Sequence, residues 1–404
     1  MDLETVEKLL QLPRIKVTAA EIGKEEIVIH VSIPPGRHRC PKCGSYSKGV
    51  SEETTVRVRD LSIFGKDCYL VIRKGRLHCH CSYRGYEEIE FVDEYQRQTT
   101  RFDEFLFRLC DKMTIMDASD LMGVNWKTAY KVDKKTLNAL RKGTKSPSVK
   151  VIGVDEIAFE KRHKYFTIVY DITEGNGVLF ATEDRKAQSL EAYYSTLTMK
   201  EKECIKVVCM DMWDPFIKAT KSHLPHAAIV FDRFHIKKHV NECIDKLRRR
   251  LVREADKDAR KVIKNKKWVL LKNPQNFKDS DHEALEELKQ LNTPLYEAYL
   301  LKEEFDQFYT CSNESEGRAF LTAWSAKMSG QLKEAFDRFI SMLSGYMYGV
   351  LTFFEHRFTN AVAEGLNNKI KVLKRMAYGY RDKEYFKLKI YRRCGYLRKA
   401  SLLT

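Results

Sequence analysis

A short apolar segment that leads into one carboxylate restricts the fold of this chain more than any other feature. Residues 151–154 read Val-Ile-Gly-Val, Asp155 follows them, and Pro147 lies just upstream. So short a run behind turn-forming residues predicts a β-strand that is buried on both faces. An unpaired carboxylate is costly to bury, so Asp155 needs a partner. That partner is either a cap or a nearby base, or it is a metal ion.

Two further apolar segments also end in an aspartate. Residues 205–210 lead into Asp211, and residues 227–231 lead into Asp232. The remaining pattern predicts two strands and two helices, over residues 165–171, 177–182, 190–197 and 215–223. Alternating strands and helices predict an α/β unit, in which functional sites gather at strand ends. Capping alone does not explain three such aspartates.

A later helix, predicted over residues 360–377, carries a glutamate on its polar face. Asn360 is expected to cap this helix. The apolar stripe is predicted to contain Val362, Leu366, Ile370, Leu373 and Ala377. The opposite stripe contains Glu364, Asn367, Asn368, Lys371 and Arg375. An exposed glutamate usually pairs with a base one turn along, but asparagines hold those positions here. Glu364 therefore lies among side chains that suit phosphate.

Two carboxylates on neighbouring strands and a third on a helix suit a pair of divalent metal ions about 4 Å apart. Such a pair serves phosphoryl transfer, because one ion activates the attacking oxygen and the other stabilises the leaving oxygen. Hard oxygen ligands favour Mg²⁺ or Mn²⁺ over zinc.

Four cysteines in the N-terminal region predict a structural zinc site. They form two pairs separated by predicted strands, Cys40 with Cys43 and Cys79 with Cys81. The first pair has the usual spacing of zinc ligands, whereas the second pair is tighter. Three cysteines with a histidine from the second pair's surroundings, or ordinary buried thiols, are the alternatives. The chain has 11 cysteines, an odd number, which favours a reducing cytosol over a disulfide framework.

Residues 102–137 are predicted to contain a helix-turn-helix. A first helix ends near Gly123, Asn125 is a good N-cap, and a second helix follows. In this motif the second helix enters the major groove of DNA with its first residues leading. The side chains of this helix expected to be available to DNA are Trp126, Lys127, Thr128, Lys131, Lys134 and Lys135. A plain helical hairpin is the alternative.

The charge of the chain supports a polyanionic partner. Lys and Arg number 72 against 56 Asp and Glu, which gives a net charge of +16. This balance favours nucleic acid. Residues 233–350 are predicted to be helical, and many of their bases lie between 237 and 267. The N-terminus lacks the pattern of a signal peptide, and no apolar run approaches the roughly 20 residues that span a bilayer. We therefore expect a cytoplasmic protein without a membrane partner.

The order of these motifs resembles the ISL3 family of insertion-sequence transposases. The zinc-binding pairs come first, then the helix-turn-helix, then "GVDE", "DM" and "DRFH", and finally "AVAEGLNNKIK" with "KRMAYGYRD". The resemblance implies an RNase H-like catalytic domain with a DDE triad of Asp155, Asp211 and Glu364, holding two Mg²⁺ or Mn²⁺ ions. Asp214 and Asp232 are rivals for the second aspartate. Asp211 is preferred because it directly follows its strand, whereas Asp232 is expected to support the site or to position His235.

We thus predict a multidomain α+β protein with an RNase H-like α/β catalytic domain that an all-helical insertion interrupts. The expected parts are a zinc-binding module, a helix-turn-helix domain, the first part of the catalytic core, the helical insertion, and a C-terminal helix with a basic tail, over residues 1–95, 96–145, 146–236, 237–350 and 351–404. The C-terminal side chains expected to bind DNA are Asn367, Lys371, Lys374 and Arg375.

The function implied is that of a DNA transposase in the bacterial cytoplasm, associated with the nucleoid. It binds terminal inverted repeats, cleaves DNA in a metal-dependent step and transfers the freed 3′-hydroxyl to target DNA, as a homo-oligomer on DNA. Two alternatives come from other classes of protein. One is a sequence-specific regulator with an inactive α/β domain, and the other is an RNase H-like nuclease without strand transfer.

Overall fold

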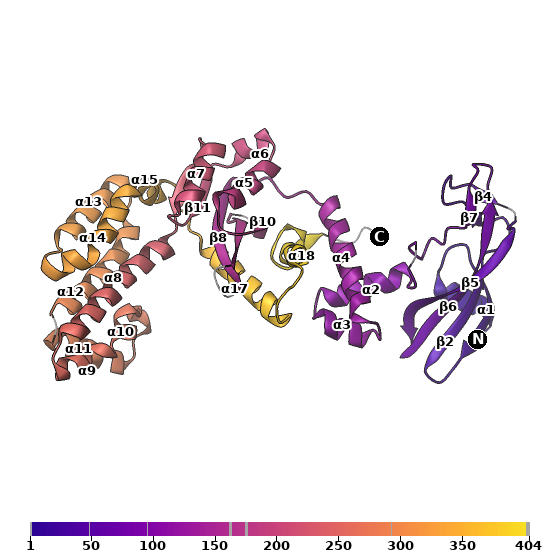
Figure 1. The fold of residues 1–404 in the computed structure, drawn as a ribbon, viewed down its shortest axis with the longest axis horizontal. Coiled ribbons are helices and arrows are strands. Elements are labelled where there is room, and N and C mark those ends of the chain that lie inside the picture. Colours follow the sequence, from indigo (N-terminus) through magenta and orange to yellow (C-terminus); the bar gives the residue numbers. More distant parts are fainter. Residues whose placement is uncertain are drawn as a thin grey trace. The chain divides into compact units, whose positions relative to one another are not determined.

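The computed structural model describes residues 2–47, 49–94, 96–160, 164–173, 177–291 and 293–400. The contacts between residues divide the chain into two compact units, one up to Lys142 and the other spanning Gly143–Ala400 (Figure 1). None of the helices within the described ranges combines the length and the apolarity that crossing a membrane requires.

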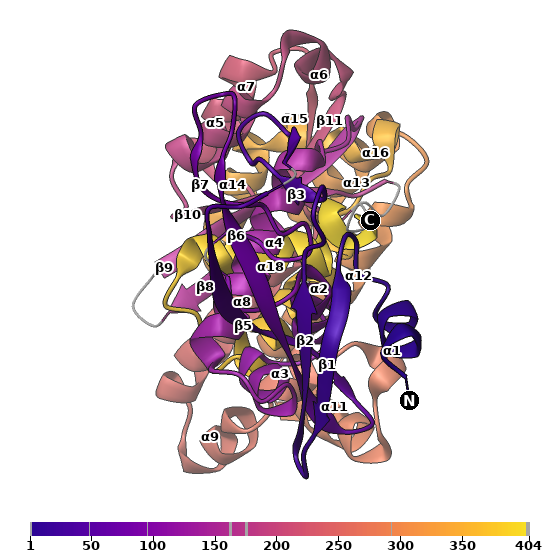
Figure 2. The same cartoon turned by 90° about the vertical axis from the view of Figure 1, so that its right-hand side faces the viewer.

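The first unit begins with a β-sheet that the sequence pattern predicted only in part. Its core path runs β1-β2-β6-β5, and β7 pairs with β6 (Figure 2). The strands of this sheet are β1 (Lys16–Ile22), β2 (Glu26–Ser32), β5 (Glu52–Ile63), β6 (Lys66–His78) and β7 (Arg84–Tyr86), after helix α1 (Leu3–Leu10). Alternate residues of β2 and β6, among them Ile29, Val31, Leu70 and Ile72, are buried and form an apolar core. A separate short hairpin pairs β3 (His38–Arg39) with β4 (Tyr46–Ser47).

Three helices complete the first unit. They are α2 (Thr100–Cys110), α3 (Ile115–Leu121) and α4 (Trp126–Gly143). Arg101 at the start of α2 forms an ion pair with buried Asp60 of β5, so this helix is fixed to the sheet by a charge pair. The predicted helix-turn-helix is therefore present as α3 and α4.

The second unit is built on a five-stranded sheet of order β10-β9-β8-β11-β12. The strands are β8 (Val151–Glu160), β9 (Lys164–Asp171), β10 (Gly177–Glu183), β11 (Val207–Met210) and β12 (Ala228–Phe231). β8, β11 and β12 are parallel, whereas β9 is antiparallel to both of its neighbours. The first four residues of β8 are buried, as the apolar segment predicted.

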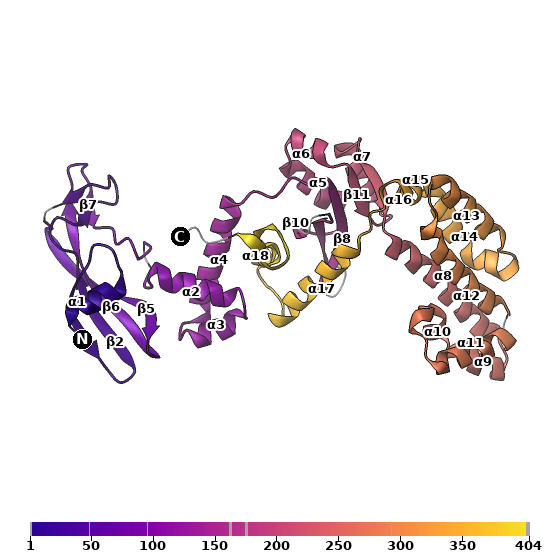
Figure 3. The same ribbon diagram turned by 180° about the vertical axis from the view of Figure 1, so that it is seen from behind.

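Helices cover both faces of this sheet. α5 (Ala187–Thr196) and α7 (Asp214–His223) pack together on one side, and α6 (Met199–Cys204) connects α5 to β11. α17 (Ala361–Met376) and α18 (Lys383–Cys394) lie on the other side (Figure 1 and Figure 3). Phe386 of α18 packs against Phe159 and Phe166 of the sheet.

The described residues between β12 and α17 are helical and contain no strand. The helices are α8 (Arg233–Glu254), α9 (Lys257–Lys264), α10 (Lys267–Leu271), α11 (Asp279–Leu291), α12 (Thr293–Gln307), α13 (Glu314–Ala326), α14 (Gly330–Gly345), α15 (Met347–Leu351) and α16 (Phe353–His356). Their cores are rich in aromatic side chains, among them Phe305, Trp324 and Phe336, which pack edge-on or tilted against one another. The helical pattern predicted for residues 233–350 is confirmed within the described ranges.

Candidate active site and DNA-binding elements

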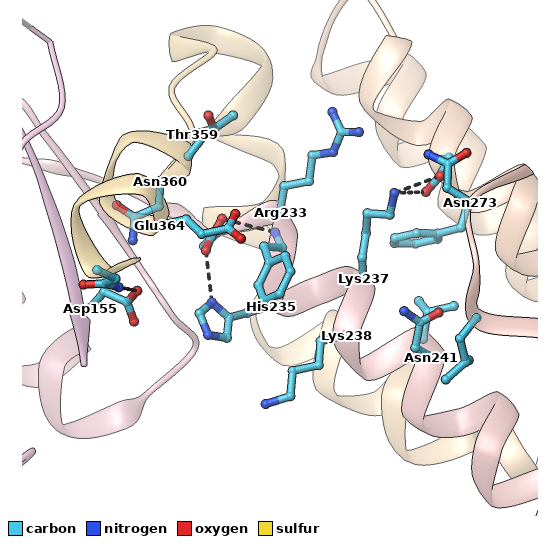
Figure 4. A pocket seen from close by; sticks show the side chains of 18 of the residues that line it. Asp155, Arg233, His235, Lys237, Lys238, Asn241, Asn273, Thr359, Asn360 and Glu364 are labelled. Carbon is cyan, nitrogen blue, oxygen red and sulfur yellow. Dashed lines mark hydrogen bonds and ion pairs between the residues drawn. The ribbon is translucent and has the colours of Figure 1, made fainter. Parts of the chain in front are cut away.

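A cavity of about 710 Å³ opens at the edge of the sheet where β8 and β12 meet α8 and α17. Asp155, Asp232 and Glu364 line it, and so does His235. Figure 4 shows Asp155, His235 and Glu364 around the pocket. Helix α12 closes the opposite side with Lys302, Glu303 and Asp306. The structure therefore brings residues that are far apart in the sequence to a single pocket.

Asp155 lies within its strand and not at its end, which differs from the sequence-based expectation. β8 runs on to Glu160, but its parallel pairing with β11 stops at Gly153. Asp155 thus stands where β11 has already ended and space is available. Its Oδ1 accepts a hydrogen bond from the backbone N–H of Glu156 at 2.7 Å. Burial raises the pKa of Asp155 above its ordinary value.

Three polar side chains, each two helical turns apart, connect α17 to β8 by hydrogen bonds. Asn360 Nδ2 donates to the carbonyl of Val154 at 3.4 Å, and Asn367 Nδ2 donates to Asp155 Oδ2 at 2.6 Å. Lys374 Nζ donates to the carbonyl of Phe159 at 2.7 Å. The spacing of seven residues places them on one side of the helix. Glu364 lies between the first two of these contacts, so they fix the place of its backbone relative to Asp155.

These contacts correct the predicted polar face of the helix. Asn367 is buried and its amide serves Asp155, and Lys374 is engaged with the strand, so neither presents a free group to DNA. Val362, expected in the buried stripe, is 43% exposed. Asn360 is buried and makes no side-chain cap, contrary to the prediction, because its amide turns toward β8.

Asn367 is itself held by a tyrosine. The hydroxyl of Tyr170 on β9 donates to Asn367 Oδ1, which turns the amide nitrogen toward Asp155. Both Tyr170 and Asn367 are buried. The two hydrogen bonds that connect Tyr170, Asn367 and Asp155 therefore set the orientation of the Asp155 carboxylate.

The other two aspartates share a histidine. Asp211 directly follows β11, and its Oδ2 lies 3.8 Å from His235 Nε2. Asp232 caps α8 through the N–H of Phe234, and its Oδ2 lies 3.0 Å from His235 Nδ1. Burial lowers the pKa of His235, but the hydrogen bond to Asp232 and the charges of Asp211 and Asp155 outweigh it, so the pKa is raised. The expectation that Asp232 positions His235 agrees with this contact.

Asp214, the remaining rival for the second aspartate, is directed elsewhere. It is the first residue of α7, and its Oδ1 accepts the hydroxyl of Tyr346 at 2.7 Å. Glu156 is a pocket residue that the sequence pattern did not single out. Burial raises its pKa to about 7, although the guanidinium of Arg185, 3.4 Å away, acts in the opposite direction.

In the first unit the four cysteines form a compact cluster. Their sulfur atoms all lie within 4.8 Å of one another, and Cys40 Sγ is 3.7 Å from Cys81 Sγ. Gly44 beside the first pair has a φ of +72°, a conformation that glycine adopts at little cost. Hydrogen bonds from Ser45 lower the pKa of Cys43 to about 6. Four cysteine sulfur atoms in such a cluster suit a tetrahedral zinc ion.

The helix-turn-helix has the local structure that its sequence predicts. Gly123 turns the chain at a φ of +61°, and Asn125 Oδ1 accepts the N–H of Lys127 at 2.9 Å as the cap of α4. The first turns of α4 expose Trp126, Lys127 and Lys131, and Thr128 is half-buried. Further along α4, Lys134 and Lys135 are bound to Tyr130 and Asp93. Lys127 and Lys131 thus lie exposed at the leading end of the helix.

Comparison with known protein families assigns each of these regions. Residues 36–81 match a zinc finger of the IS204/IS1001/IS1096/IS1165 transposases. Residues 87–135 match the helix-turn-helix domain of transposase family ISL3, and residues 152–390 match the transposase model of the same family. The zinc-ribbon match and the cysteine cluster together support a structural zinc ion.

Curated relatives extend over most of the chain. The transposase for insertion sequence element IS1001 from Bordetella parapertussis is 32% identical over 355 residues, covering 87% of each protein. The transposase for element IS1557 from Mycobacterium tuberculosis is 22% identical over 369 residues, covering 85% of this chain and 83% of the relative. With a family model across the whole α/β unit and a relative of this identity, the chain belongs to the ISL3 family of insertion-sequence transposases.

Proposed function

We propose that the protein is a DDE-type DNA transposase that cleaves DNA at the terminal inverted repeats of its element and joins the freed 3′-hydroxyl to target DNA. The observation that carries this proposal is the pocket shared by Asp155 and Glu364, with Asp211 linked to it through His235. The acids come from β8, β11 and α17, as the triad predicted from the sequence requires.

The architecture of the second unit supports an RNase H-like catalytic core. It is a mixed five-stranded sheet with helices on both faces and with Asp155, Asp211 and Asp232 at one edge. The helices α8 to α16 lie in sequence between β12 and the helix that carries Glu364. We interpret them as an insertion into this core, with the catalytic part resuming near residue 351.

The acids fit divalent metal ions by their chemistry. Asp155, Asp211 and Glu364 offer only hard oxygen atoms, which favour Mg²⁺ or Mn²⁺. Among the described residues, only the four cysteines bring three or more possible ligand atoms within 4.8 Å of one another, so the acids stand farther apart. Two such ions, when bound, supply activation of the attacking oxygen and stabilisation of the leaving oxygen.

The remaining side chains prepare the site for a phosphodiester. Asn367 and the backbone of Glu156 each donate to one oxygen of Asp155, which orients the carboxylate. Lys238 and Lys371 line the same pocket and are exposed, so their ammonium groups can bind phosphates on either side of the scissile bond. A homo-oligomer bound to both ends and to target DNA completes the proposed assembly.

The test is a cleavage assay on duplex DNA that carries the terminal inverted repeats of the element. We expect a nick at the repeat boundary that leaves a 3′-hydroxyl in Mg²⁺ or Mn²⁺ and no nick when neither ion is added. Tight, specific binding without a metal-dependent nick would instead identify a regulator with an inactive α/β domain. Nicks at structured sites, independent of the repeats, would identify a nuclease.

Asn367→Ala is expected to slow cleavage about 10- to 100-fold, the range for one hydrogen bond to a charged group. Because Asp155 loses its orienting donor, the Mg²⁺ concentration for half-maximal rate should also rise. Kinetics at varied Mg²⁺ measure both effects, and DNA affinity should not change. Asn276→Ala is the control, since Asn276 is an exposed amide that does not line this pocket. A slower Asn367→Ala enzyme with an unchanged Mg²⁺ requirement would show a merely structural role.

Lys371→Ala and Arg375→Ala are expected to weaken binding to specific and random DNA alike. Both side chains are exposed on α17, and contacts with phosphates carry no sequence information. The slope of log affinity against log salt should fall by about one for each lost base. Lys127→Ala and Thr128→Ala in α4 should weaken binding to the terminal repeat more than to random DNA. A selective loss of the repeat by Lys371→Ala would contradict this division.

A further inference from the structure

The pocket extends well beyond the acids, and its far part has a different chemistry. Figure 4 shows Asp155, His235 and Glu364 on one side and Lys237, Asn241 and Asn273 on the other. The total volume of about 710 Å³ is in the range of sites that enclose an organic molecule, and far more than two ions require. The pocket therefore has room for more than two ions and one phosphate.

One face of α8 runs from the acids toward the far part and supplies three different groups to the pocket. Phe234, Lys238 and Asn241 are spaced by four and three residues, so they lie on the same side of the helix. All three line the pocket. The ring of Phe234 is 58% exposed, which is unusual for a phenylalanine surrounded by charged side chains. This face offers an aromatic surface, an ammonium group and an amide in one row.

The amides in the pocket have unused hydrogen-bonding capacity. Half-buried Asn241 forms no side-chain hydrogen bond within the described part of the chain, so its donor and its acceptor are both free. Asn273 Oδ1 accepts a hydrogen bond from the N–H of Gln275 at 3.1 Å. This bond leaves the side-chain amide nitrogen of Asn273 available to a ligand. Asparagine side chains of this kind recognise the edges of bases through paired hydrogen bonds.

We propose that the row of Phe234, Lys238 and Asn241 is a receptor site for a nucleobase that leaves the duplex next to the scissile phosphate. The base stacks on Phe234, Asn241 binds its edge, and Lys238 binds the adjoining phosphate. Stacking on an exposed ring within a positively charged groove is how proteins hold unpaired bases, and extraction of a base opens the duplex around the reacting bond. This inference rests on the proposed function, because it places the scissile phosphate at Asp155 and Glu364.

A binding measurement tests the base site without any catalysis. Duplexes carrying the terminal repeat, with 2-aminopurine at each position beside the repeat boundary in turn, are mixed with the full-length protein in buffer without Mg²⁺ or Mn²⁺. One position should gain fluorescence several-fold as that base leaves its stack. The gain should be lost in Phe234→Ala. It should persist in Trp268→Ala, the matched control, because Trp268 is 75% exposed on α10 and does not line this pocket.

Cleavage of paired and mismatched ends provides the second measurement. Phe234→Ala should slow cleavage of fully paired ends by about 5- to 150-fold, the range for one stacked base. A mismatch at the same position should restore most of the rate, and Phe234→Trp should cleave paired ends nearly as fast as the wild type. Asn241→Ala should reduce the preference among the four bases at that position.

Three results would overturn the base site: no fluorescence gain with saturated wild-type protein, a gain that persists in Phe234→Ala, or equal slowing of paired and mismatched ends. If the wild type cleaves neither kind of end in Mg²⁺, the proposed transposase chemistry fails. The fluorescence measurement still decides the base site in that case.

Discussion

Asp155→Asn, Asp211→Asn and Glu364→Gln are each expected to slow metal-dependent cleavage of terminal-repeat DNA by about 10³-fold or more. Each change removes a charged oxygen ligand, which is worth several kcal/mol in the transition state. Binding to the repeats should stay within a few-fold of the wild type. Asp155→Asn removes a buried charge but keeps only one of the two acceptors for Glu156 and Asn367, so its melting temperature is compared with that of the wild type to show that the variant is folded. Single-turnover cleavage and thermal unfolding of the same preparations measure these effects.

Asp214→Asn is the matched control for the second aspartate. Asp214 belongs to the same segment as Asp211, but it accepts a hydrogen bond from Tyr346. We expect Asp214→Asn to cleave at close to the wild-type rate. An active Asp211→Asn beside an inactive Asp232→Asn would move the second triad position to Asp232, and full activity of any triad variant would remove that residue from the triad.

The second large effect is expected at the cysteine cluster. Cys43→Ser should bind no zinc, whereas the wild type should bind one zinc ion per chain. Structural zinc contributes about 10–16 kcal/mol of apparent binding free energy in small zinc domains, so the segments around the ligands should unfold without it. Metal analysis with hydrogen exchange on the full-length protein should show lost protection over residues 38–47 and 79–86.

The main sheet of the first unit should survive the loss of zinc. Ile29, Val31, Leu70 and Ile72 form a core of their own, apart from the cysteines, so β2 and β6 should keep their protection. Cys204→Ser, which changes a thiol outside the cluster, should retain the zinc. A metal-free protein with full protection around Cys40 and Cys79 would exclude the zinc site.

The sequence predicted those parts of the fold that local patterns encode. The apolar segments before Asp155, Asp211 and Asp232 form strands, as predicted. Apolar runs of this length are too short for a typical helix and suit a strand that is buried on both faces. The turn at Gly123 and the cap at Asn125 were also predicted correctly, since both depend only on neighbouring residues.

The errors concern polar side chains whose partners are distant in sequence. On a helical wheel, Asn367 falls on the same face as other polar side chains, and we therefore predicted that it lies on the exposed face of α17. The structure buries this amide, because Tyr170 and Asp155, about 200 residues earlier in the chain, supply its hydrogen bonds. The position of Asn360 was misjudged for the same reason. Glu156 was missed because an acid that directly follows Asp155 gives no spacing signal of its own.

The joining of pre-cleaved ends tests the central claim most directly. Duplexes whose terminal repeats already end in a 3′-hydroxyl are incubated in Mg²⁺ with a supercoiled target plasmid and either the wild type or Glu364→Gln. We predict that the wild type produces plasmid covalently joined to the labelled end, and that Glu364→Gln binds the same end without joining it. Joining by Glu364→Gln at the wild-type rate, or stable binding by the wild type with no joined product in Mg²⁺ or Mn²⁺, would contradict the account.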